Sequence, residues 1–183
     1  RIEDADLAIK KGLEIGTQQQ KNQLAISAAS RLLDDRIEQH LDKEKVAEIK
    51  HYLGHIELAD DSVQRTATVV ALTMVQHALA LVQANFAKAE TLRATLVSIG
   101  GVDDALVLGL EAKAALFKAK ANNHSVSKAV QLTRRAIEQQ TNSIHRDSLR
   151  LTLVEALLDH DKEQANAEFL FISKPDESAK SIL

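Results

Sequence analysis

Three segments of the chain carry small residues where a helix needs them to approach a neighbouring helix closely. In each segment an alanine is followed by a second residue four positions on and a third seven positions on, all on one helical face: Ala89, Arg93 and Leu96; Ala129, Thr133 and Ala136; Ala165, Phe169 and Ile172. The alanines are 40 and then 36 residues apart. A loose period in this range predicts stacked antiparallel helical hairpins, in which each segment is the second helix of a pair.

Composition favours helix over almost the whole chain. The 183 residues include one proline and six glycines, so few residues interrupt helices or mark turns. Apolar residues make up 45% of the chain, which is enough to bury the core of one domain. The sequence therefore predicts an all-α protein with essentially no strand.

The spacing of apolar residues divides the chain into about nine helices. They are expected at about residues 4–15, 19–43, 45–59, 62–83, 87–99, 103–121, 126–140, 147–158 and 162–172. Ser125 and Asp147 are expected to cap the seventh and the eighth of these helices. We expect a single helical domain over residues 1–173 and a polar C-terminal tail or linker over residues 174–183.

The expected helix at residues 62–83 is apolar over more than half of its circumference. Its apolar residues include Val63, Val70, Met74 and Val82. A helix with so wide an apolar surface is packed on two sides. One of these sides can be a subunit interface, so a homodimer remains one possible state of the protein.

The hairpin pattern resembles the tetratricopeptide repeat family between about residues 62 and 172. Leu108 and Gly109 resemble the Leu-Gly pair in the first helix of a repeat, and Ala112 occupies the following small site. The segment beginning at Ala129 fits the pattern of the second helix, and residues 85–89 resemble the hairpin turn. The spacing is longer than in that family and only 3% of residues are aromatic, so the chain is similar to a degenerate member with lengthened first helices.

This resemblance implies a stacked α-solenoid whose first helices line a concave groove. It also implies a non-catalytic scaffold that binds a peptide or a partner protein in the groove, without a cofactor. The groove residues that it implies are Gln76, Lys113, Arg146 and Arg150. Arg146 and Arg150, together with Lys128, Arg134 and Arg135 of the preceding helix, form either a patch that grips carboxylates or an ordinary charged helix surface.

Charge and composition disfavour several other classes of partner. The net charge is −3 and the isoelectric point is about 6.2, so no overall positive field attracts nucleic acid. The absence of cysteine excludes disulfides and thiolate chemistry. No apolar run approaches the roughly 20 residues that cross a bilayer, so we expect no membrane insertion and a cytoplasmic protein.

One group of residues has the spacing of a metal site. Glu48, His51 and His55 fall within a narrow sector of one helix, where a carboxylate and two imidazoles can converge on one ion. A fourth ligand is missing, and the segment lacks the glutamate of the zinc-protease motif. The alternative is a solvated face beside an apolar stripe, and the sequence predicts no metal site.

A second hypothesis follows from the start of the chain. It begins at Arg1 and its only methionine is Met74, so we expect a fragment of a longer protein. The fragment would then be a helical regulatory or dimerisation module of a larger bacterial-type signalling protein. A stable dimer through residues 63–82 would favour this module, and a monomer with an open groove would favour the scaffold.

Overall fold

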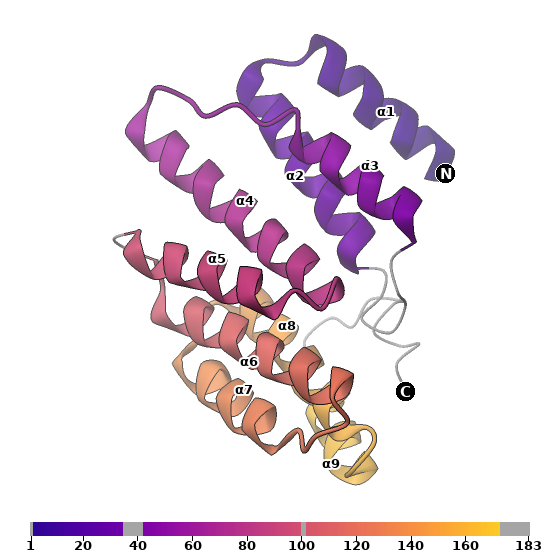
Figure 1. The fold of residues 1–183 in the computed structure, drawn as a ribbon, viewed down its shortest axis with the longest axis vertical. Helices are drawn as coiled ribbons and strands as arrows, with labels where there is room; N and C mark the ends of the chain where they lie inside the picture. Colours follow the sequence, from indigo (N-terminus) through magenta and orange to yellow (C-terminus); the bar gives the residue numbers. More distant parts are fainter. Residues whose placement is uncertain (1, 35–41, 100–101, 173–183) are drawn as a thin grey trace. The chain divides into compact units, whose positions relative to one another are not determined.

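The computed structural model describes residues 2–34, 42–99 and 102–172, and this part of the chain is all-helical (Figure 1). It contains nine helices: α1 (Ile2–Ile15), α2 (Gln18–Asp34), α3 (Lys43–Leu53), α4 (Ser62–Val82), α5 (Phe86–Ser98), α6 (Asp104–Ala121), α7 (Ser127–Gln139), α8 (Ser143–Leu157) and α9 (Lys162–Leu170). Each helix expected from the sequence is present, and the described residues contain no strand. The proposed tail at 174–183 lies outside the described residues, as does most of the expected end of the second helix.

Two expected helix caps are wrong. Helix α8 begins four residues before Asp147, because the Asn142 side chain accepts hydrogen bonds from the amides of Ile144 (3.0 Å) and His145 (3.2 Å). Asp147 therefore lies inside the helix. The N-cap of α7 is Val126, which makes no side-chain cap hydrogen bond. The Ser125 hydroxyl accepts a long hydrogen bond (3.3 Å) from the amide of Ser127.

The chain divides into two compact units, Arg1–Leu92 and Arg93–Leu183, and α5 crosses the division. The sequence-based expectation of one domain over residues 1–173 stays a prediction, because two compact units can still fold together. In the first unit α2 is the central helix and contacts α1, α3 and α4. The core there combines residues from all four helices, including Leu13, Ala29, Ile49 and Leu79.

In the second unit each helix from α6 to α9 contacts the next one in the chain, and α6 also contacts α8. The contact between α6 and α8 is close at Gly109. A Cβ atom added there would lie 2.8 Å from Cδ2 of Leu149. The core between α8 and α9 contains Leu153, Val154 and Ala165. These contacts support hairpins formed by helices that follow one another in sequence.

The alanines that repeat in the sequence are buried. Ala89, Ala129 and Ala165 each expose at most 1% of their surface, and the third residue of each segment is buried as well. The prediction that these small side chains are buried and do not point into water is therefore confirmed. Thr133 is also fully buried, and its hydroxyl donates to the carbonyl of Ala129 (2.7 Å).

The turns that follow α4 and α6 share one backbone conformation. Ala84 after α4 and Asn123 after α6 have positive φ angles of 53° and 52°. The amides of the next residues, Asn85 and His124, donate to carbonyls five positions back at 2.8 Å in both turns. This is the Schellman motif, which satisfies carbonyls that a helix leaves open at its end. The same motif therefore ends both α4 and α6.

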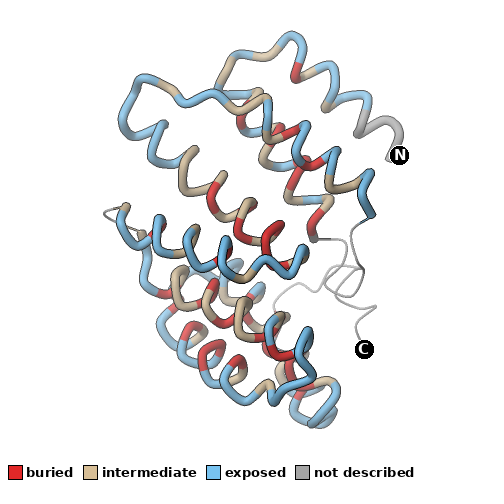
Figure 2. The backbone as a smooth tube through the Cα atoms, viewed as in Figure 1, coloured by how far each residue is buried: buried red, intermediate tan, exposed pale blue. Residues whose placement is uncertain are grey.

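Helix α4 corrects one expectation from the sequence. Among the described residues it is the single helix whose length and apolar composition match a membrane span, whereas the sequence analysis expects no such stretch. However, 33% of its most apolar window is buried, and Val75 and Leu79 belong to the core of the first unit. Figure 2 shows exposed residues at the start of α4 and buried residues toward its end. A core helix passes the same test, so length and composition do not identify a membrane span here.

Candidate partner-binding surface

Helix α7 has one buried face and one charged face. Ala129, Leu132, Thr133 and Ala136 point into the core of the second unit. Lys128, Gln131, Arg134, Arg135 and Glu138 are exposed. Because its apolar residues follow a regular helical period, α7 presents its basic residues together to the solvent.

An open cleft of about 680 Å³ lies along this charged face. It is lined by residues of α7, of the turn before it and of the end of α8 and the turn that follows: Ser125, Val126, Ser127, Val130, Gln131, Arg134, Arg135, Glu138, Leu157 and His160. Val126, Val130 and Leu157 are partly or fully buried and supply the apolar part of the lining. All of these residues belong to the second unit.

The charge of the cleft is predominantly positive. The cleft is lined by two arginines, Arg134 and Arg135, by one carboxylate residue, Glu138, and by His160. Arg134 also donates from Nη2 to Oε1 of Gln164 on α9 (2.8 Å), which fixes its position. Guanidinium groups bind carboxylates with paired, charge-assisted hydrogen bonds. The cleft can therefore hold an acidic side chain beside an apolar one.

Arg146, which the tetratricopeptide resemblance places in a groove, contacts the end of α7. Its Nε and Nη2 atoms donate to the carbonyl of Gln140 at 3.0 and 2.7 Å. Gln140 is the residue at which α7 ends. The last carbonyls of a helix lack partners within it and carry partial negative charge, so a cation is favourable there. Arg146 thus satisfies the carbonyl at which α7 ends, and this contact lies within the second unit.

Arg150, the next predicted groove residue, contacts the end of α9 in the same way. Its Nη1 atom donates to the carbonyl of Phe171, where α9 ends, and its guanidinium carbon lies 5.3 Å from the centre of the Phe171 ring. Nη1 also lies 3.9 Å from a carboxylate oxygen of Asp147. The four arginines of α7 and α8 therefore separate into two that line the cleft, Arg134 and Arg135, and two that contact helix ends, Arg146 and Arg150.

The other two predicted groove residues lie in different units. Gln76 is half-buried on α4 in the first unit, and Lys113 is half-buried on α6 in the second. Their part in partner binding stays a prediction, as does that of Arg146 and Arg150. The cleft residues Val126, Leu157 and His160 were not singled out from the sequence, because only the folded chain brings the end of α8 beside α7.

The structure separates the three residues of the metal hypothesis. Oε1 of Glu48 accepts a hydrogen bond from the hydroxyl of Tyr52 (3.3 Å), whereas the Nε2 atoms of His51 and His55 lie 3.4 Å apart. Within residues 2–34, 42–99 and 102–172 no group of three or more His, Cys, Asp or Glu side chains is arranged to hold an ion. Of the three residues that the sequence analysis considered for a metal site, only His51 and His55 therefore bring their ring nitrogens together.

Compared with models of protein families, curated protein sequences and solved structures, the chain shows no match.

Proposed function

We propose that this chain is a non-catalytic helical scaffold that binds an acidic segment of a partner protein. The observation that carries the proposal is the cleft beside α7, where Arg134 and Arg135 lie next to an apolar lining formed by Val126, Val130 and Leu157. An extended or helical peptide that alternates apolar and acidic side chains matches this surface in both respects.

The arrangement of α6 to α9 supports a scaffold. Consecutive helices contact one another, α6 approaches α8 closely at Gly109, and the repeated alanines are buried. These features agree with the stacked hairpins of a tetratricopeptide-like solenoid, which we propose as the finer description of the fold. Rigid helices hold the cleft side chains in place before a partner arrives, which lowers the entropic cost of binding.

The cleft can supply a useful affinity. A micromolar complex corresponds to about 8 kcal/mol of binding free energy. Two hydrogen bonds to charged groups supply roughly 1.5–3 kcal/mol each, and burial of one apolar anchor adds about 1.5–3 kcal/mol. Because association itself costs at least about 4 kcal/mol, a micromolar complex also needs further contacts at the rim of the cleft.

The experiment that tests this proposal compares two labelled peptides by fluorescence anisotropy. Both have the same leucines and length, and they differ in carrying either glutamates or lysines between them. We expect the acidic peptide to bind and the basic peptide to bind at least tenfold more weakly. The affinity for the acidic peptide should also fall as the salt concentration rises, because exposed charges are screened.

A matched pair of variants locates the binding surface. Arg134→Glu with Arg135→Glu reverses two adjacent charges at the cleft, and Lys10→Glu with Lys11→Glu reverses two adjacent exposed charges on α1. The first variant should lower the affinity for the acidic peptide about tenfold or more, and the second should leave it within about twofold. Equal losses in both variants would assign the binding to overall charge and refute the cleft.

A second candidate function, a dimerisation module, depends on the exposed first half of α4. Val63 exposes 76% of its surface there, and the residues from Ser62 to Ala67 are all exposed. A molar mass in solution that is twice the chain mass, and that returns to the chain mass on Val63→Glu, would favour this function. For either function we propose a cytoplasmic location, which agrees with the absence of cysteine.

A further inference from the structure

Two histidines of the first unit bring the same ring atom, Nε2, close together. His51 lies in the last turn of α3, and His55 follows Gly54, the residue at which this helix ends. Their Nε2 atoms are 3.4 Å apart, and the two rings stand almost perpendicular to each other, at 88°. His51 is exposed and His55 is half-buried, so an ion can reach both from solvent.

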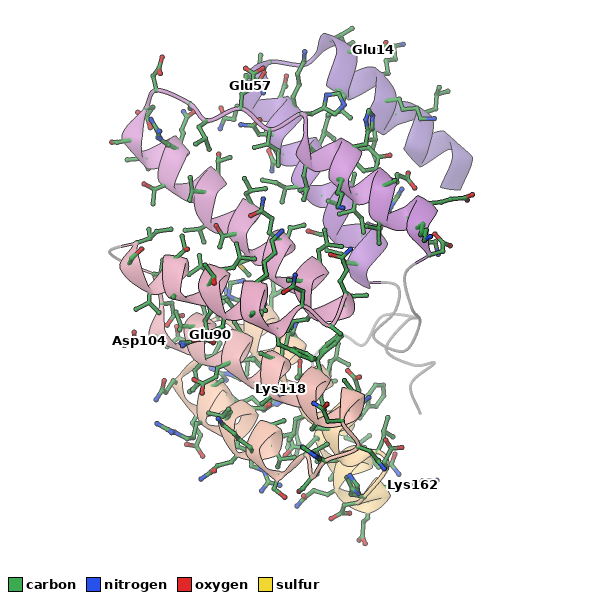
Figure 3. The ribbon with its side chains drawn as sticks, in the orientation of Figure 1. Glu14, Glu57, Glu90, Asp104, Lys118 and Lys162 are labelled. Carbon is green, nitrogen blue, oxygen red and sulfur yellow. The ribbon has the colours of Figure 1, made fainter. Side chains whose placement is uncertain are left out.

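Contacts with α2 hold the segment that carries His55. The side chain of Gln18 donates to the carbonyl of His55 (3.2 Å). Asn22, only 5% exposed, donates to the carbonyl of Glu57 (2.6 Å) and accepts from its amide (3.0 Å). Figure 3 shows Glu57 on the connection between α3 and α4. The backbone around His55 is thus fixed against a neighbouring helix, and the spacing of the two imidazoles does not depend on α3 alone.

We propose that His51 and His55 form a two-imidazole site for a divalent transition-metal ion of the Zn²⁺ type. Zinc binds imidazole nitrogen at about 2.0–2.1 Å in tetrahedral geometry, which places two nitrogen ligands about 3.3–3.4 Å apart. The observed separation of 3.4 Å agrees with this value. Imidazole is also a ligand that Zn²⁺, Cu²⁺ and Ni²⁺ accept readily.

The ion replaces the proton that the two rings share in its absence. One of the Nε2 atoms carries that proton when they are hydrogen-bonded. On metal binding the donor ring loses its proton from Nε2 and takes one up on Nδ1 by exchange with water, so both Nε2 atoms present lone pairs and each neutral ring carries its proton on Nδ1. Among the described residues the Glu48 carboxylate does not form a three-ligand group with the two imidazoles, so water completes the coordination in the proposed site. A site with two protein ligands and open positions binds metal less tightly than a closed structural site.

The test is a titration of the metal-free protein with Zn²⁺, followed by calorimetry at neutral pH. His51→Gln and His55→Gln should each lower the affinity about tenfold or more, because each removes one of two ligands. His145→Gln is the matched control, since this histidine is also exposed but lies on α8 in the second unit. It should leave the affinity unchanged.

Measurements on the unaltered protein check the site without any variant. Zn²⁺ should shift the ring NMR signals of His51 and His55 at lower concentration than those of His124, His145 and His160. Saturating Zn²⁺ should also raise the melting temperature, because a ligand of the folded state stabilises it. Equal affinity in His51→Gln and in the control, or simultaneous shifts of all the exposed histidines, would overturn the proposal.

Discussion

Replacing Ala165 by leucine tests the packing of the repeated small residues. Ala165 is completely buried on α9 and lies in a cluster with Leu153, Val154 and Leu157 of α8. A leucine there adds an isopropyl group to a contact that has no space for it. Either α9 moves away from α8 or the neighbouring leucines leave their preferred rotamers, and both responses cost free energy.

Overpacking of this kind costs about 1–3 kcal/mol. For a chain of this length each 1 kcal/mol lowers the melting temperature by about 2–4 °C, so the expected decrease is roughly 2–12 °C. Helix α9 also offers a matched control, because Ala167 is exposed two residues further on. Ala167→Leu makes the same chemical change in the same helix and should alter the stability by no more than about 0.5 kcal/mol.

Thermal unfolding of the two variants, followed by far-UV circular dichroism in parallel, gives the difference directly. Because alanine and leucine have similar helix propensities, intrinsic propensity does not account for a difference between the variants. If Ala165→Leu melts within 1 °C of Ala167→Leu, the close contact between α8 and α9 is wrong. The inference from repeated alanines to stacked hairpins would then lose its support.

Two further substitutions test the polar contacts within each unit. Arg146→Gln removes the charged donor from the end of α7 and should lower the free energy of urea unfolding by about 1–2 kcal/mol. The control, Arg135→Gln, changes an exposed position on α7 and should alter this free energy little. Equal effects of the two substitutions would contradict the role of Arg146 at the helix end. Asn22→Ala removes both hydrogen bonds to Glu57 and should lower the free energy of unfolding by about 2 kcal/mol in the same assay. Gln23→Ala, at the exposed neighbouring position, should change it negligibly. A loss under about 0.5 kcal/mol for Asn22→Ala would show that these hydrogen bonds contribute little.

Much of the helical structure could be predicted because its causes are local. The apolar period, the scarcity of proline and polar breaks such as Asp60 to Ser62 set the number of helices and most of their ends. The burial of Ala89, Ala129 and Ala165 could be anticipated for the same reason, since the residues on one helical face follow from spacing. The error at the start of α8 arose because Asn142 and Asp147 both have side chains suited to capping, and the sequence does not show which is used.

The polar contacts of the site could not be predicted, because they join residues that are distant in sequence or depend on how the chain turns. Arg150 contacts Phe171 only because α9 folds back along α8. Arg134 and His160 share a cleft for a similar reason. By contrast, the spacing of His51 and His55 correctly placed them on one face, and Glu48, the third residue considered there, bonds to Tyr52.

The two arginines of α8 also affect how this part of the molecule opens. Arg146 and Arg150 are one turn apart, and they contact the ends of the helices that precede and follow α8. If α8 frays or unwinds, both of its neighbours lose a partner for their final carbonyls at the same moment. Amide hydrogens in α7, α8 and α9 should therefore exchange with solvent at similar rates, as one cooperative block rather than as three independent segments.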